Sequence, residues 1–131
     1  MTKENKELLM KYLCMASPYD VIVDYENHIY ILNEVNPACK DMDYITVLIQ
    51  DVERLMCAEN EMIEDIKPYL RPMSSMTEEE LKEFQEFRNI TPLDWLPLAL
   101  DWLLEYHFDF MGLIPKDLAI EVTEENNPYE N

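Results

Sequence analysis

The chain contains 131 residues, of which 28 are acidic and 10 are basic, so its formal net charge is −18 at pH 7. Apolar residues make up 48% of it, which is enough for one compact domain with a core, while so negative a chain is repelled by nucleic acid and by anionic membranes. The single glycine argues against phosphate-binding loops, and the three cysteines, which form no CxxC pair, argue against a disulfide framework or zinc ribbon. We therefore expect a cytoplasmic protein that has no cofactor and no metal.

The first predicted element is a helix over residues 1–16. Thr2 is a suitable N-cap, and the Ser17-Pro18 pair ends the helix because proline disfavours helical backbone in the residue before it. Five apolar residues fall on one face at helical spacing: Leu8, Leu9, Tyr12, Leu13 and Ala16. This face is expected to pack on the rest of the domain.

The next part of the chain changes to the period of β-strands. We predict strands at 20–25, 28–35, 44–50, 54–58 and 66–70, with a short helical turn within 60–66. Glu26 and Asn27 form a two-residue hairpin connection, in which Asn27 can adopt left-handed backbone. Several short strands within about fifty residues predict a small SH3-like β-barrel over 17–72, and hence an α+β fold class.

Residues 73–131 are predicted to be a helical C-terminal part that packs on the barrel, so that the chain is one compact unit. Thr77 and Glu80 have the spacing of a capping box, and Pro92 begins a second helical signal, for which we favour a start near Pro97. Gly112 is interpreted as a helix stop, followed by a short strand at 118–122. The polar tail from 123 is expected to fray.

Three segments carry a resemblance: "LCMASPYDVIVDY", "IEDIKPYLRPMSSMTEEE" and "HFDFMGLIPKDLAIEV". In that order they are similar to small uncharacterised proteins of gut-bacterial (Bacteroides-type) phages and prophages. The resemblance covers most of the chain and implies a phage or mobile-element origin, an early barrel followed by helices, and no assigned activity. Members of that group often have glycine where this chain has Asp20 and Asp117.

Few residues suggest chemistry. Asp101, Glu105 and Asp109 would share one face if the helix persisted, and such a row is typical of a solvated face or, as an alternative, of a cation site. His107 is interpreted as a packing or helix C-terminal histidine. The cysteines Cys14 and Cys57 are interpreted as buried small hydrophobic residues.

Charge is the most informative feature. Residues 66–76 hold two basic residues, Lys67 and Arg71, and no acid, so we expect these two cations to fasten the helical part to the barrel through ion pairs. Acidic residues lie on both sides of this stretch. Those predicted to bind a partner are Glu59, Glu61, Glu64, Asp65, Glu78, Glu79 and Glu80.

The first functional hypothesis is a non-enzymatic interaction protein whose acidic surface binds a basic partner. That partner would be a nucleic-acid-handling host protein, and the acids would mimic phosphates so as to inhibit a bacterial defence system. The chain itself would bind neither nucleic acid nor membrane. A second hypothesis is a structural or assembly adaptor of a phage, with Trp95, Trp102 and Phe110 as apolar anchors. A third is a metal-dependent hydrolase that uses Asp101, Glu105, His107 and Asp109.

Overall fold

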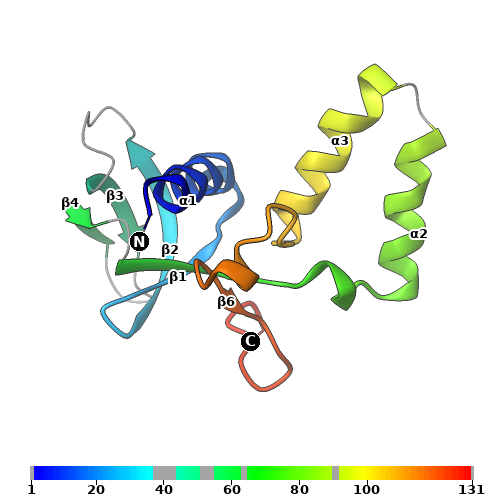
Figure 1. The fold of residues 1–131 in the computed structure, drawn as a ribbon. Coiled ribbons are helices and arrows are strands. Elements are labelled where there is room, and N and C mark those ends of the chain that lie inside the picture. Colours follow the sequence, from blue (N-terminus) through cyan, green and yellow to red (C-terminus); the bar gives the residue numbers. More distant parts are fainter. Residues whose placement is uncertain (1, 37–43, 51–54, 63–64, 90–91, 131) are drawn as a thin grey trace.

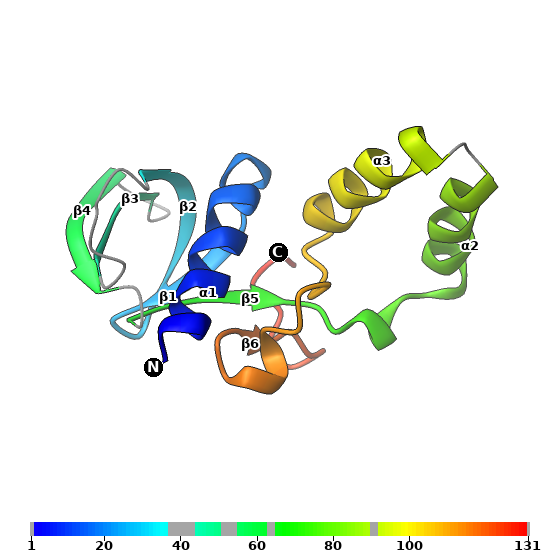
Figure 2. The ribbon, with the colours of Figure 1, turned by 45° about the horizontal axis from the view of Figure 1, so that its top comes forward.

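The structure is a computed structural model that describes residues 2–36, 44–50, 55–62, 65–89 and 92–130. Its elements are, in order, α1 (Lys3–Ala16), β1 (Ile22–Tyr25), β2 (His28–Asn36), β3 (Tyr44–Gln50), β4 (Leu55–Met62), β5 (Ile66–Leu70), α2 (Glu78–Glu86), α3 (Pro92–Glu105) and β6 (Ile120–Glu121). The predicted α+β class is therefore confirmed. In both views α2 and α3 lie to one side of the sheet, beyond α1 (Figures 1 and 2).

The strands form one sheet in the order β4-β3-β2-β1-β5-β6. Neighbours from β4 to β5 pair antiparallel, while β6 pairs parallel to β5 through Tyr69 opposite Ile120. The predicted closed SH3-like barrel is wrong, because the sheet of the described residues is open. β5 lies between β1 and β6, and β6 pairs with the last two residues of β5, Tyr69 and Leu70.

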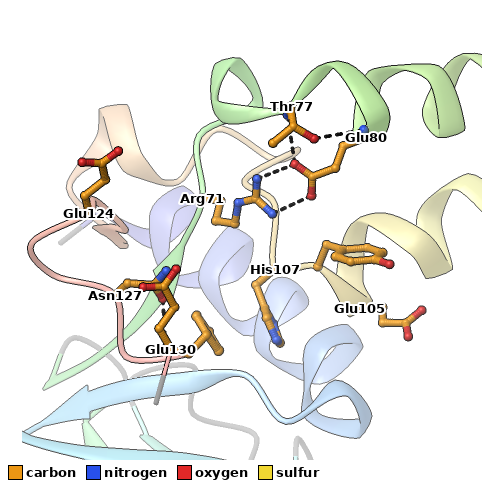
Figure 3. Close-up of a pocket in the computed structure, with 10 residues that line it drawn as sticks. Arg71, Thr77, Glu80, Glu105, His107, Glu124, Asn127 and Glu130 are labelled. Carbon is orange, nitrogen blue, oxygen red and sulfur yellow. Dashed lines mark hydrogen bonds and ion pairs between the residues drawn. The ribbon is translucent and has the colours of Figure 1, made fainter.

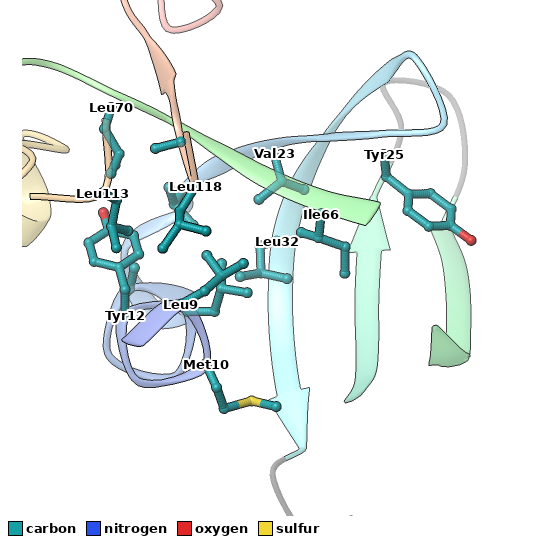
Figure 4. Close-up of a cluster of buried hydrophobic side chains, with 14 of the residues drawn as sticks. Leu9, Met10, Tyr12, Val23, Tyr25, Leu32, Ile66, Leu70, Leu113 and Leu118 are labelled. Carbon is teal, nitrogen blue, oxygen red and sulfur yellow. The ribbon is translucent and has the colours of Figure 1, made fainter. Parts of the chain in front are cut away.

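Helix α1 covers the sheet and contributes the centre of the core (Figure 4). Thr2 caps it, because the backbone N–H of Asn5 donates to the Thr2 hydroxyl at 3.1 Å. The predicted apolar face is buried as expected at four positions, Leu9, Tyr12, Leu13 and Ala16, all of which are fully buried. They pack with residues of the strands and of the C-terminal part, namely Val23, Leu32, Ile66, Leu70, Leu113 and Leu118.

Left-handed backbone occurs at the predicted turns. Glu26 and Asn27, at φ 50° and 64°, join β1 to β2, which confirms the two-residue hairpin. Asp20 and Asp117, at φ 55° and 59°, adopt the same conformation. Aspartate at these two positions thus adopts backbone that glycine favours.

The predicted helical turn at 60–66 is partly wrong. Residues 60–62 are the last part of β4, and 63–64 lie outside the described residues. The helical preference of these residues is outweighed by pairing with β3, since Met62 lies opposite Tyr44.

Helices α2 and α3 form an antiparallel hairpin. The capping box at the start of α2 is confirmed: the Glu80 N–H donates to the Thr77 hydroxyl at 3.1 Å, and the Thr77 N–H donates to the Glu80 carboxylate at 3.0 Å. The predicted start of the next helix near Pro97 is wrong, because α3 is continuous from Pro92 and contains Pro97. A proline so near the N-terminus removes one backbone hydrogen bond, a loss that burial of the later turns can outweigh.

Helix α3 ends at Glu105, seven residues before Gly112, so the predicted stop at Gly112 is wrong. His107 ends the helix instead, in left-handed backbone with φ 62°. The His107 N–H donates to the Leu104 carbonyl at 3.1 Å and the Phe108 N–H to the Leu103 carbonyl at 3.0 Å, which is the Schellman pattern. None of the described helices is long and apolar enough to cross a membrane.

Candidate functional site

A pocket of about 550 Å³ lies at the joint between the sheet, the helical hairpin and the C-terminal segment (Figure 3). Three parts of the chain build it: the segment from the end of β5 to the start of α2, the end of α3, and residues 124–130. Its lining consists of Arg71, Thr77, Glu80, Glu105, Tyr106, His107, Glu124, Asn127, Tyr129 and Glu130.

Arg71 is held on both its backbone and its side chain. Its N–H donates to the His107 carbonyl at 2.8 Å, and its carbonyl accepts from the Asp109 N–H at 2.8 Å, so the residue after β5 pairs with the chain after α3. Its guanidinium donates twice to the Glu80 carboxylate, at 2.7 and 2.8 Å, and lies 4.3 Å above the centre of the Phe108 ring. Arg71 therefore connects the sheet, α2 and the end of α3.

Glu80 is fully engaged by this arrangement. Its carboxylate accepts both guanidinium hydrogen bonds as well as the Thr77 N–H, and these bonds lower the pKa of Glu80 to about 2. The Arg71 and Glu80 side chains are only 23% and 16% exposed. A charge that is paired and largely enclosed contributes to stability more than to an external contact.

The second predicted ion pair is more exposed. Lys67 in β5 contacts Asp117 at 3.2 Å, and the Asp117 side chain is 91% exposed. Exposed pairs of this kind stabilise little. Both cations of the 66–76 stretch thus form ion pairs with the part of the chain that follows, as expected, but the Arg71 pair carries the connection.

His107 lies on the wall of the pocket as a neutral side chain. Burial, together with the Arg71 charge, lowers the pKa of His107 to about 4, although Asp20 acts in the opposite direction. Its ring is stacked on Tyr129, with 4.0 Å between ring centres and 10° between planes. Its Nδ1 is buried and has no hydrogen-bond partner among the described residues. The sequence interpretation as a packing and helix-terminal histidine is confirmed, but without a positive charge on the ring.

This lowered pKa predicts an acid-sensitive contribution to stability. As the pH is lowered below about 6.5, the unfolded chain binds a proton at His107, whereas the folded chain does not do so until about pH 4. The free energy of unfolding therefore decreases as the pH falls from about 6.5 to about 4. Asn tolerates left-handed backbone, which makes His107→Asn the suitable variant. Between pH 7.5 and 5 the wild type should lose about 1 kcal/mol more stability than His107→Asn, allowing for the partial exposure of the ring.

Urea unfolding of both proteins at the two pH values measures this difference. All other titrating groups are shared by the two proteins and cancel in the comparison. Equal losses in both proteins would show that His107 takes up its proton as readily in the folded chain as in the unfolded one.

Tyr129 anchors the C-terminal segment, so the expectation that the tail frays is wrong for this residue. Its hydroxyl donates to the Tyr69 carbonyl at 2.8 Å and accepts from the Ile22 N–H at 2.9 Å. The hydroxyl thus bridges β1 and β5 where the two strands lie side by side. Burial raises the pKa of this phenol, which keeps it protonated and able to donate.

The predicted row of carboxylates is not formed, because α3 ends at Glu105. Asp109 lies beyond the helix and is 8% exposed, and its carboxylate accepts from the Leu113 and Ile114 N–H groups at 2.7 and 3.0 Å. Asp101 is exposed and accepts a hydrogen bond from the Tyr19 hydroxyl. The four residues of the hydrolase hypothesis therefore face different surroundings. Within the described ranges, no group of three or more His, Cys, Asp or Glu side chains is placed to hold a metal.

The residues predicted to bind a partner have different environments. Asp65, Glu78 and Glu79 are exposed, whereas Glu80 is turned to Arg71. Glu59, Glu61 and Glu64 lie outside the side chains that the structure describes.

The proposed apolar anchors differ as well. Trp102 is 8% exposed and packs with Phe84, Phe87 and Phe108, and its indole N–H donates to Glu83 at 3.0 Å. Phe110 is partly buried, and Trp95 lies outside the described side chains. Trp102 is thus a core residue of the hairpin.

Sequence reasoning missed the wall of the pocket formed by the C-terminal segment. Glu124, Glu130 and Tyr129 belong to a stretch without hydrophobic period, and only the isolated aromatic residue in a polar tail signalled an anchor. Cys14, in contrast, is partly buried on α1, and burial raises the pKa of its thiol, as expected for a packing cysteine.

Comparison of the chain with known proteins gives no match to a protein-family model, to a curated protein or to a solved structure.

Proposed function

We propose that the protein is a non-enzymatic, phage-type interaction protein that binds a basic, nucleic-acid-handling protein in the host cytoplasm through its acidic surface. Nucleic-acid mimicry that inhibits a bacterial defence system is the form of this interaction that we favour. The observation that carries the proposal is the net charge of −18 combined with carboxylates that no described basic side chain pairs with. These carboxylates are exposed around the joint: Glu78, Glu79, Glu105, Glu124 and Glu130.

Placement of the charges supports a contact surface on this side of the molecule. Glu78 and Glu79 begin α2, while Glu105 ends α3 and Glu124 and Glu130 belong to the C-terminal segment (Figure 3 shows the latter three). Three parts of the chain that are far apart in sequence thus bring acids to one region. Carboxylates at a helix start also interact favourably with the helix dipole, which accounts for part of the pattern at α2 without a partner.

The proposal predicts salt-sensitive binding to a basic polypeptide. A hexa-arginine peptide with blocked ends should bind the full chain about tenfold more weakly at about 0.5 M salt than at about 0.05 M, because screening shortens the reach of charges to a few Å. Calorimetric titration measures both affinities. An affinity that does not change with salt would contradict an acidic binding surface.

If a particular surface binds the peptide, the effect of removing a charge must depend on where that charge lies. Replacing Glu78 and Glu79 by Gln removes two charges, as does replacing the exposed Glu4 and Glu7 of α1. The first pair should weaken peptide binding more than the second. Equal effects would mean that the peptide responds to total charge alone.

The adaptor hypothesis would have to use apolar residues other than the predicted anchor Trp102. Trp102 is buried, but α3 exposes Leu96 and Leu98 at 60% and 48%, and α2 exposes Leu81 at 45%. An assembly contact through these residues would be insensitive to salt. A homo-oligomer whose assembly does not change with salt would therefore favour the adaptor hypothesis.

A further inference from the structure

We propose that the pocket at the joint is the site that receives an arginine side chain of the basic partner. The inference rests on the proposed function and names the chemical group that this surface recognises. Three features carry it: unpaired carboxylates around the pocket, aromatic rings on its wall, and its size.

The first feature is charge. Four carboxylates and one guanidinium line the pocket, and the guanidinium of Arg71 is already paired with Glu80. Glu105, Glu124 and Glu130 have no ion pair with any described residue. They come from the end of α3 and from two positions of the C-terminal segment. In Figure 3, Glu124 and Glu130 lie on one side of His107 and Glu105 lies on the other, so a cation in the pocket would be attracted from both sides.

The second feature is the aromatic wall. Tyr106 is 40% exposed, although its ring also packs on Trp102 at 5.0 Å between ring centres, and the Tyr129 ring is stacked on His107. A planar guanidinium stacks on such rings and is attracted by their faces, which favours arginine over lysine. The His107 ring is neutral and adds no repulsion, and its buried Nδ1 has no partner among the described residues.

The third feature is size. A volume of about 550 Å³ is within the range of ligand pockets, which is about 300–1,000 Å³. It accommodates one long side chain with its neighbouring backbone, and the carboxylates at its rim can contact the flanking residues of a basic segment. An anionic group such as a phosphate would meet a net negative lining.

The test is a titration of the isotope-labelled full chain with a tri-arginine peptide with blocked ends, followed through backbone amide signals at about 0.05 M salt. We expect saturable shifts at residues 105–107 and at the non-proline residues of 124–130. Replacing Glu124 and Glu130 by Gln should weaken binding about fivefold, because the variant loses the binding free energy of two exposed charge contacts. Replacing Glu4 and Glu7 by Gln removes the same charge elsewhere and should weaken binding less than twofold. Tri-lysine should bind at least twofold more weakly than tri-arginine.

Each other outcome has a definite meaning. If Glu78 and Glu79 prove important while Glu124 and Glu130 behave like the α1 control, the pocket proposal fails and the acidic-surface function stands. If all three pairs have equal effects, or no peptide binds, both proposals fail. If tri-lysine binds as well as tri-arginine, the assignment of a guanidinium is wrong. Thermal unfolding of each variant confirms that the compared proteins are folded.

Discussion

Reversing the charge of Arg71 with Arg71→Glu is expected to lower the free energy of unfolding by about 3 kcal/mol. The change removes a two-bond ion pair and the contact with the Phe108 ring, and it places a second carboxylate against Glu80 in partly enclosed surroundings. Denaturant unfolding at pH 7 measures the effect. If Arg71→Glu left stability unchanged and weakened only the binding of a basic peptide, Arg71 would belong to the interface and not to the joint.

A double-mutant cycle isolates the ion pair itself. Arg71→Met retains much of the side-chain volume, and Glu80→Gln retains a residue that can complete the capping box with Thr77. The coupling energy between the two variants should be favourable at pH 7. Because the pKa of Glu80 is lowered to about 2, this stabilisation is complete above the ordinary carboxyl pKa of 4.5 and is lost as the pH falls through about 2. A coupling that persists unchanged at the lowest pH would contradict the role given to the Glu80 charge.

Tyr129→Phe is expected to cost about 2 kcal/mol although it removes a single oxygen atom. The Ile22 N–H and the Tyr69 carbonyl would both lose their partner at the place where the C-terminal segment crosses β1 and β5. Hydrogen exchange at the Ile22 amide should also increase.

The matched control is Tyr106→Phe. Tyr106 lines the same pocket, is 40% exposed and has no hydrogen bond from its hydroxyl within the described part of the chain. Its change should stay within about 0.5 kcal/mol of the wild type. If both variants lose the same stability, the bridge made by Tyr129 contributes nothing specific.

Local signals predicted local structure well in this chain. The helix after Thr2, the hairpin at Glu26-Asn27 and the capping box at Thr77 all depend on residues within four positions of one another, and all three are present. Where the prediction failed, the structure depends on tertiary packing and not on local sequence. Pro97 lies inside α3, whose later turns are buried on one face, and the sheet is open, with a short strand from the far end of the chain paired with the end of β5.

The same distinction explains the site. Arg71 as a structural cation was predictable, because it is one of two basic residues in an otherwise acidic surrounding. The sequence predicts its partner Glu80 to be an interface residue, since the capping pattern does not show that the carboxylate also reaches a guanidinium nine residues earlier. The contribution of Tyr129 depends on contacts 60 and 107 residues away along the chain, which no local pattern indicates.

The acidic surface also has a bearing on where a partner must be sought. The carboxylates at the joint that pair with no described basic side chain belong to α2, α3 and the C-terminal segment, so the proposed partner, if it contacts them together, would cover the side of the molecule away from β4 (Figure 1). Variants on α1 therefore serve as charge-matched controls in every binding experiment.

Capture of host proteins on the immobilised full chain, from a nuclease-treated bacterial lysate at about 0.1 M salt, tests the central claim most directly. We predict that a basic nucleic-acid-binding protein is retained, is released at about 0.5 M salt, and is lost when Glu78, Glu79, Glu124 and Glu130 are replaced by Gln, but not when Glu4 and Glu7 are. Duplex DNA should displace it. Retention that survives high salt, or that the four-residue variant and the α1 control affect equally, would contradict the claim.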